Sequence, residues 1–284
     1  MFFDSHVHSY VSPDSEMHPE EAVAALKKMG LGIAFTEHAD YATHEEADPD
    51  ATDAPRGIGD FVVDFERYPK EYEKFRGEGV MLGLEFGLTK AYAKLNEKIA
   101  NSYDYDFILG GVHCIDGVEI YHASKGLLPN EPITQQMTSD DTETVMNCIQ
   151  QYLKYSREMV EFNGNFYDSF AHMAYFARYA PKPSELCVYE NFRREIDALL
   201  KAIAERELAF EINTYRYKNY PSAAHEMLKC CRSFKRLGGK YCTFGSDAHK
   251  VSNLGRNIDD AIYIARESGL IPVYFKERKP IRCE

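Results

Sequence analysis

The feature that most constrains the fold of this chain is a repeated pattern of a short apolar run with a polar or histidine-bearing end. The runs are FFDSHVH, LGIAFTEHAD, VMLGLEFGL, DYDFILGGVHC, FYDSFAHMAY, ELAFEINTY and KYCTFGSDAH, and helix-like segments lie between several of them. Strands that alternate with helices are typical of parallel sheets built from βα units. In α/β barrels the reactive side chains gather at the carboxyl ends of the strands. The pattern therefore predicts a functional site at one end of an α/β barrel.

The helix-like segments have suitable ends. HPEEAVAALKKMG places Pro19 and two glutamates in a first turn and Gly30 after a last turn. DTETVMNCIQQYLKYSREMVEF, YENFRREIDALLKAIAER and GRNIDDAIYIARESG, which Gly269 closes, are also expected to be helical. Two longer connections begin at HADYAT and at DGVEIY, and each is expected to be either a substrate wall or a solvated surface loop.

Length and composition favour a single domain over residues 1–284, because α/β barrels of this size are routinely one domain and 44% of the residues are hydrophobic. No apolar run reaches the roughly 18 residues that indicate a transmembrane helix, and the first residues lack a signal-peptide pattern. We therefore expect a cytoplasmic protein without a membrane partner. The seven cysteines are scattered and form no C-x-x-C pair, so we expect reduced thiols, most of them in the core.

The net charge of −12 disfavours proteins that grip nucleic acid, which usually have a basic surface. A small phosphorylated substrate remains compatible with this charge, because bound metal ions can supply local positive charge. The oligomeric state is not indicated.

The polar ends of the runs together predict a metal site. Histidines at i and i+2 on a strand point to the same face, so His6 and His8 should reach into one barrel mouth. Imidazoles and carboxylates are the ligands of Zn, Mn and Fe. The candidates at the strand ends and in the loop after the first strand are His6, His8, Asp14, Glu37, His38, Glu85, His113, His172, Asp247 and His249.

The other histidines are expected to have structural or solvent roles, since isolated histidines serve many such purposes. His18 precedes a helix-start proline, His44 lies in an acidic loop, and His225 is in a helical segment without matching neighbours. His122 is a partial exception, because its loop follows His113.

In order, the motifs HVH, EH, GLEFG, GGVHCIDG, AH and SDAH resemble the PHP superfamily. VHCIDG with His122 shortly after it, and EINTYRYKNYPS, resemble the stand-alone histidinol-phosphate phosphatases of that superfamily. The resemblance runs from about residue 3 to about residue 255. It implies a distorted, TIM-like (β/α)7 barrel, a centre of three divalent ions (Zn, Mn or Fe), and hydrolysis of L-histidinol phosphate in histidine biosynthesis.

The resemblance also implies three sets of metal ligands. The first set is His6, His8, Glu85 and Asp247. The second set is Asp14, His38 and His249. The third set is Glu85, His113 and His172. Asp14 lies in SPDS, where turn chemistry alone would also explain it. Ala174 departs from the family pattern, which often has an acidic residue there, and this departure leaves the expected ligand set unchanged.

The expected mechanism uses a metal-bound hydroxide, held by Glu85, Asp247 and His249, that attacks phosphorus in line. Arg178, Arg216 and Lys218 are the candidate phosphate contacts, because they lie just past strand ends and arginine can bind phosphate through two parallel hydrogen bonds. The alternative for each is a surface charge paired with an acidic neighbour. Asn213 could orient a substrate group or a ligand, and Tyr215 or Tyr217 could pack against an imidazole.

Three other functions are alternatives to this one. A related phosphoesterase could act on another small phosphorylated metabolite or nucleotide with the same metal site. A nuclease is disfavoured by the charge and by the absence of a polymerase region. A non-catalytic metal-binding module would normally have gaps in the ligand series, and none of the nine expected ligands is missing.

Overall fold

The computed structural model describes residues 1–41, 61–115, 118–120, 136, 139–178 and 181–284. Most of the two long connections, together with His44 and His122, lies outside the described residues. Expectations about them stay predictions.

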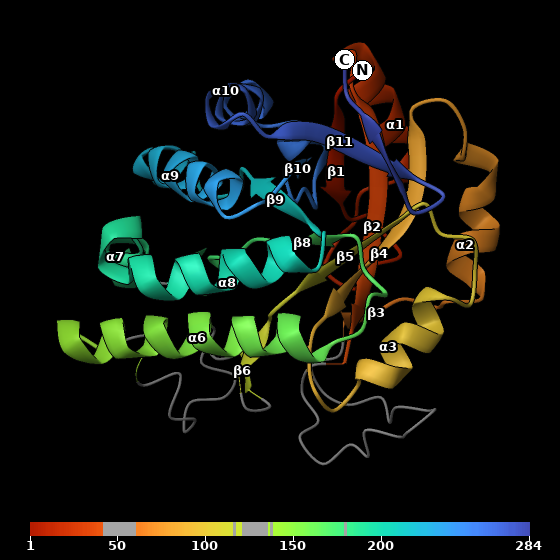
Figure 1. Ribbon diagram of the computed structural model, residues 1–284. Helices are drawn as coiled ribbons and strands as arrows, with labels where there is room; N and C mark the ends of the chain where they lie inside the picture. Colours follow the sequence, from red (N-terminus) through yellow and green to blue (C-terminus); the bar gives the residue numbers. More distant parts are fainter. Residues whose placement is uncertain (42–60, 116–117, 121–135, 137–138, 179–180) are drawn as a thin grey trace.

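Seven parallel strands form the centre of the molecule (Figure 1). In spatial order they are β1 (Phe3–Val7), β2 (Gly32–Asp40), β4 (Val80–Gly87), β5 (Phe107–Gly111), β8 (Ser169–Phe170), β9 (Ala209–Asn213) and β10 (Tyr241–Gly245). Each predicted run contains one of these strands, which confirms the predicted α/β class with parallel pairing. Three two-residue strands flank the site end: β3 (Phe61–Val62), β6 (Cys114–Ile115) and β7 (Val118–Glu119).

The sheet curls without a continuous ladder between β1 and β10. A single parallel bridge joins Val7 to Ala248. Beside it, the Asp247 amide donates to the His6 carbonyl at 2.9 Å, and the His8 amide donates to the Ala248 carbonyl at 3.0 Å. These contacts bring the carboxyl ends of the first and seventh strands together, as a distorted barrel requires.

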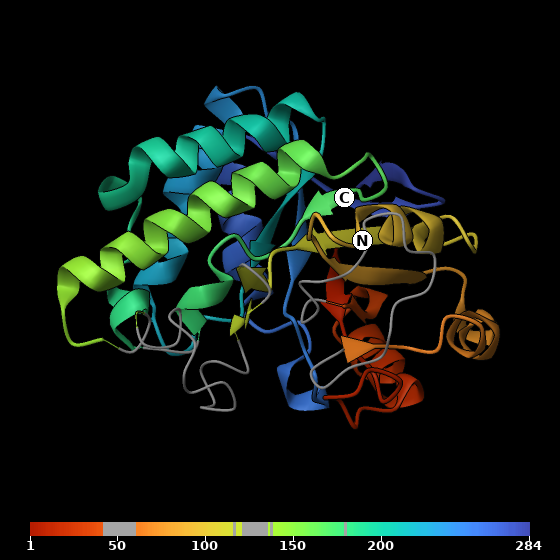
Figure 2. The ribbon, with the colours of Figure 1, turned by 90° about the horizontal axis from the view of Figure 1, so that it is seen from below.

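Helices cover the outside of the sheet (Figures 1 and 2). α6 (Thr142–Phe162), α8 (Arg193–Glu205), α9 (Ser222–Arg236) and α10 (Ile258–Ser268) lie in a row on one side. The other helices among the described residues are α1 (Pro19–Lys28), α2 (Arg67–Tyr72), α3 (Ala93–Ala100) and α7 (Pro181–Leu186), with short 3₁₀ helices η1 (Glu73–Phe75), η2 (Tyr175–Arg178), η3 (Tyr189–Phe192) and η4 (Val251–Asn253).

The predicted helix ends are confirmed. α1 begins at Pro19, and Gly30 and Gly269 follow α1 and α10 with φ of 71°, a conformation that favours glycine. The Asp141 side chain accepts the Thr144 amide hydrogen and so caps α6.

An antiparallel hairpin closes the end of the sheet where the strands begin. Its strands are β11 (Ile271–Lys276) and β12 (Lys279–Arg282). The ring of Tyr274 stacks on Phe3 at 4.1 Å, and that of Phe275 stacks on Phe107 at 5.1 Å. We call this apolar group the base cluster; it consists of Phe3, Ala34, Met81, Phe107, Leu109, Ala171, Ala209, Val273 and Phe275.

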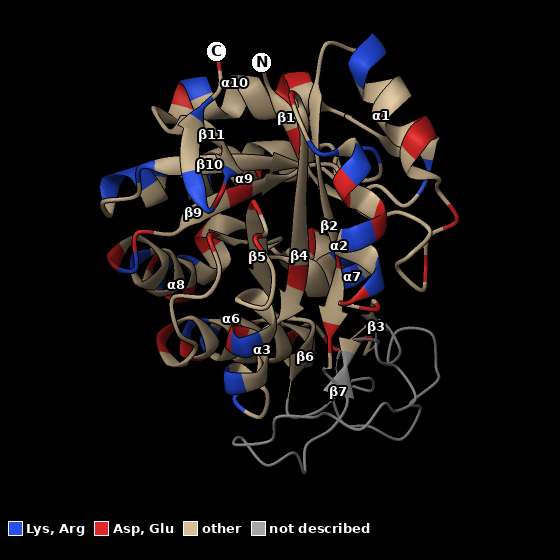
Figure 3. Ribbon diagram, turned by 90° about the vertical axis from the view of Figure 1, so that its right-hand side faces the viewer, with Lys and Arg blue, Asp and Glu red and all other residues tan. Residues whose placement is uncertain are grey.

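The charged residues of α1 lie at its two ends, with Glu20 and Glu21 in the first turn and Lys27 and Lys28 in the last turn (Figure 3).

The cysteines belong mainly to the core. All seven cysteines are free, and six of them are buried. In the part of the chain that the structure describes, we find no helix with the length and apolarity needed to cross a bilayer.

Candidate metal centre

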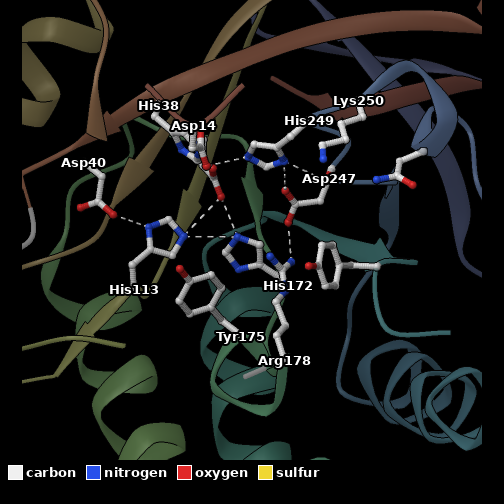
Figure 4. Close-up of a pocket in the computed structure, with 13 residues that line it drawn as sticks. Asp14, His38, Asp40, His113, His172, Tyr175, Arg178, Asp247, His249 and Lys250 are labelled. Carbon is white, nitrogen blue, oxygen red and sulfur yellow. Dashed lines mark hydrogen bonds and ion pairs between the residues drawn. The ribbon is translucent and has the colours of Figure 1, made fainter. Parts of the chain in front are cut away.

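The nine predicted ligands meet at the carboxyl end of the sheet, which we call the mouth, and several of them are labelled in Figure 4. They come from six strands and the segments that follow them: His6 on β1 with His8 and Asp14 after it, His38 on β2, Glu85 on β4, His113 after β5, His172 after β8, and Asp247 with His249 after β10. Seven of them line a cavity of about 350 Å³ together with other residues considered below: Asp14, His38, Glu85, His113, His172, Asp247 and His249.

Glu85 is at the centre of the mouth and is 1% exposed. Its Oε1 lies 2.6 Å from His172 Nε2 and 3.3 Å from the Nε2 atoms of both His113 and His6. Its Oε2 lies 3.1 Å from His38 Nδ1 and 3.5 Å from His8 Nε2. One carboxylate therefore faces five imidazoles, which is an arrangement suited to bridging two cations.

Asp14 joins the two imidazoles on the outer side of the mouth. Its Oδ1 is 3.4 Å from His38 Nε2, and its Oδ2 is 2.9 Å from His249 Nε2. Burial raises the pKa of Asp14, but the charge of His38 and hydrogen bonds to both histidines outweigh it, so the pKa is lowered. The structure thus brings Asp14 to the site residues rather than leaving it as an isolated turn residue.

The residues present fit metal ions. His8 is fully buried, and neither of its ring nitrogens has a hydrogen-bond partner among the described residues. Buried polar atoms without partners are rare and call for an explanation. Three groups have ligand atoms within 4.8 Å of one another: His8, His38 and His249; His6, His8 and Asp247; and His6, Glu85 and His172. These groups differ in detail from the expected sets, because His8 also approaches His38 and His6 also approaches His172.

Two buried carboxylates contact the Nδ1 atoms of predicted ligand histidines. Neither carboxylate was predicted from the sequence. Glu211 Oε1 lies 2.6 Å from His6 Nδ1, and Asp40 Oδ2 lies 2.5 Å from His113 Nδ1. If these carboxylates are ionised, both Nδ1 atoms carry the hydrogen and both Nε2 lone pairs face the cavity. This is the usual way that metal-ligating histidines are oriented.

Strand periodicity could have identified both of these carboxylates. Asp40 is two positions after His38 on β2, and Glu211 is two positions before Asn213 on β9, so each shares a face with a residue already considered. Glu211 also accepts the amide hydrogens of His172 and the Asn213 side chain, at 2.6 and 3.1 Å. Asn213 therefore orients a carboxylate of the site.

The chain accepts local strain and uses glycine to bring these groups together. His172 and Asp247 have φ of 21° and 55°, and non-glycine residues in this region often mark functional sites. A Cβ on Gly245 would lie 2.1 Å from Glu211 Oε1 and 2.6 Å from the His6 Cβ. A larger residue at Gly245 would thus separate His6 from its carboxylate.

Burial and charge affect the histidines differently. Burial lowers the pKa of His172 to about 4, and the Arg178 guanidinium acts in the same direction. Burial would also lower the pKa of His113, but Asp40 and Glu85 outweigh it and raise that pKa to about 10. A divalent ion next to Glu85 would remove this difference in pKa between His113 and His172, because ligation requires neutral imidazole.

Of the three predicted phosphate contacts, Arg178 lines the cavity. Its Nη2 is 2.5 Å from Asp247 Oδ2 and 3.3 Å from Asn213 Oδ1, and its guanidinium lies over the rings of Tyr175 and Tyr215 at 5.1 and 4.5 Å. Among the described lining residues, neither Arg216 nor Lys218 is present. Arg216 instead donates to the Ser184 carbonyl and hydroxyl on α7.

The histidines that were expected to have structural or solvent roles, as far as the structure describes them, lie away from the cavity. His18 precedes α1 and packs near the ring of Tyr10, at 5.2 Å between centroids, and His225 lies on α9. Glu37, whose neighbour His38 faces the mouth, points to the other side of β2 and accepts hydrogen bonds from Ser9 and Ser12.

Comparison with known proteins agrees with this geometry. The family model described as "PHP domain" matches residues 4–215. The chain belongs to the PHP family. A protein of Clostridium acetobutylicum named "Probable histidinol-phosphatase" is 32% identical over 98% of both chains. The histidinol-phosphatase of Lactococcus lactis is 28% identical over 94% of this chain and 91% of its own.

A solved structure extends the likeness to nearly every residue. The crystal structure of histidinol phosphate phosphatase from Lactococcus lactis, complexed with zinc, L-histidinol and phosphate, superimposes with a TM-score of 0.82. It is 26% identical in sequence to this PHP protein and covers 99% of both chains. The family's barrel thus accounts for the curled parallel sheet described above.

Proposed function

We propose that this PHP protein is a metal-dependent phosphomonoesterase that hydrolyses L-histidinol phosphate to L-histidinol and phosphate in histidine biosynthesis. The observation that carries the proposal is the convergence of nine histidine and carboxylate side chains, seven that line one cavity and two, His6 and His8, that lie directly behind Glu85 and Asp247. Similarity to named histidinol-phosphatases over almost the whole chain supports the choice of substrate.

The proposed ligands are His6, His8, Asp14, His38, Glu85, His113, His172, Asp247 and His249. Bound divalent ions lower the pKa of water and neutralise charge on phosphate oxygens, which is the chemistry that a stable phosphate ester needs. Glu85 would be shared between ions, and Glu211 and Asp40 would hold His6 and His113 in the ligating tautomer. Arg178 would hold Asp247 in place and offer hydrogen bonds to the substrate. Zinc is the first metal to test, because the Lactococcus lactis structure contains it; Mn and Fe favour similar ligands.

Charge supports more than one ion. Asp14, Asp40, Glu85, Glu211 and Asp247 surround the centre, and Arg178 and Lys250 offset two of these five charges. With neutral histidines, one divalent ion would leave the centre negative. Three ions, the number that the family resemblance implies, would make it positive and so favour binding of a phosphate dianion.

We also propose that residues 1–284 form one domain, because β1 meets β10 at the mouth and the Met1 amino group donates to the Glu284 carbonyl at 2.6 Å.

The test is phosphate release by purified protein loaded in turn with Zn, Mn and Fe. Histidinol phosphate should be hydrolysed with the highest kcat/KM in a panel that includes nucleotides and sugar phosphates. Equal rates on generic esters would reject histidinol phosphate as the substrate. Preference for another ester would select the related phosphoesterase function instead.

A further inference from the structure

The loop from Ser246 to Gly255 carries two proposed metal ligands, and one buried carboxylate holds both of its ends. Asp4 is fully buried. It accepts the backbone N–H of Ser246 at 2.9 Å and that of Gly255 at 2.8 Å, and the Ser246 hydroxyl at 2.5 Å. Arg256 also donates to the Ser246 carbonyl at 2.8 Å. The loop is therefore fixed over the mouth, and its side chains have defined starting points.

Two side chains of this loop line the cavity without belonging to the proposed ligand set. They are Lys250, directly after His249, and Asn253, at the end of η4. Figure 4 shows the Lys250 nitrogen directed toward the side of Asp247 and His249. The Asn253 amide hydrogen bonds to the Lys250 carbonyl at 2.9 Å, which links the two positions.

Both side chains have unused donors. Within the described residues, the Lys250 ammonium makes no ion pair and no hydrogen bond, although several carboxylates lie in the same cavity. The Asn253 carboxamide likewise has no partner there. Arg178, on the other side of Asp247, is already engaged with that carboxylate at 2.5 Å. An anion that enters the cavity would meet free donors on the loop.

We propose that Lys250 and Asn253 bind the phosphate group of the substrate, with the ammonium and the carboxamide donating to non-bridging oxygens. The proposal rests on the proposed function and deepens it. A lysine ammonium is a compact charge that suits phosphate. The same charge would repel the amino group of histidinol, so it orients the ester with its phosphate toward the loop. Lys250 thus adds a lysine to the candidate phosphate contacts that were predicted from the sequence.

The test compares Lys250→Met and Lys250→Arg with Lys201→Met, a matched change of an exposed lysine on α8 that does not line the described cavity. Calorimetry measures binding of inorganic phosphate to zinc-loaded protein whose metal content equals that of the wild type. Lys250→Met should weaken phosphate binding about 10- to 100-fold, the usual range for a lost charged hydrogen bond. Lys250→Arg should recover most of this loss, Asn253→Ala should lose about threefold to tenfold, and Lys201→Met should match the wild type.

Inhibition by L-histidinol separates the two ends of the substrate. It should be unchanged in Lys250→Met, while KM for histidinol phosphate rises more than kcat falls. Unchanged phosphate affinity in Lys250→Met would overturn the proposal, and so would a loss confined to L-histidinol. If the protein does not hydrolyse histidinol phosphate but Lys250→Met still loses phosphate affinity, the substrate assignment fails and the phosphate site stands.

Discussion

On β4, Met81 and Glu85 lie four residues apart on one face, and on β2 the same spacing separates Ala34 from His38. Met81 and Ala34 belong to the base cluster, whereas Glu85 and His38 face the mouth. The same strands thus supply an apolar core at one end and a group of titratable side chains at the other. The base lowers the free energy by removing apolar surface from water. The mouth holds buried carboxylates and imidazoles, which favour the fold only when their charges are matched.

The largest expected effect comes from the centre of the mouth. Glu85→Gln should lower kcat/KM for histidinol phosphate by about 10⁴-fold, because metal ions supply several kcal/mol of transition-state stabilisation and each 1.36 kcal/mol is a factor of ten. Steady-state kinetics and elemental analysis would measure activity and metal content. Glu161→Gln on the exposed end of α6 is the matched control. A fully active Glu85→Gln enzyme would contradict the proposed centre.

At the base, Phe107→Ala should reduce the free energy of unfolding by about 3–5 kcal/mol, because it leaves a cavity under Phe275. Urea denaturation would measure this loss. The folded variant should keep its metal content and most of its kcat. A variant that loses metal while its stability is unchanged would show that the two ends are not separate in function.

Metal removal tests the mouth alone. Zinc at a free concentration of 100 times its Kd should raise the free energy of unfolding by about 2.7 kcal/mol over chelated protein, since it binds the folded state. The increment should be the same in Phe107→Ala, because distant sites usually add. Identical denaturation curves with and without zinc would argue against a metal centre.

The smallest effect is expected at the carboxylate behind His6. Glu211→Gln should weaken zinc affinity about 10- to 100-fold, as is typical when the partner of a metal-ligating histidine is lost. The side-chain amide cannot accept all three hydrogen bonds that Glu211 now accepts. A chelator competition would measure the affinity, with Glu195→Gln on α8 as the control. Unchanged affinity would make Glu211 a purely structural residue.

The sequence predicted the mouth better than the base. His6, His8, Asp247 and His249 could be predicted because they follow apolar strand-like runs, and Asp14 could be predicted as a candidate because it follows the first run, whereas its place beside His38 and His249 came from the family resemblance. Asp40, Glu211 and Lys250 were missed because their importance depends on what lies opposite them across the sheet. Arg216 had the right chemistry and sequence position, but its side chain turns toward α7.

The hairpin at the base was not predicted, although its first strand, β11, is largely apolar. Its turn residues, Glu277 and Arg278, have φ of 50° and 63°, where Asn or Gly is the usual sign of a hairpin. The turn is held from outside, because the Glu277 and Arg278 amides donate to Asp106 and the Arg278 guanidinium pairs with Asp168 at 2.6 Å. Tertiary contacts therefore replace the local signal.

The hydrogen bond from the Ser246 amide to Asp4 joins residues that are 242 positions apart. This separation determines when the site can form during synthesis of the protein. Contacts of such long sequence separation are among the slowest to form. At 5–20 residues per second, a ribosome needs roughly 12–48 s to synthesise the chain between them. During this time the nascent chain contains His6 and His8 but not yet Asp247 and His249. The complete metal centre can form only after β10 has been synthesised and has packed against β1. Metal uptake would therefore report that these two strands are in contact.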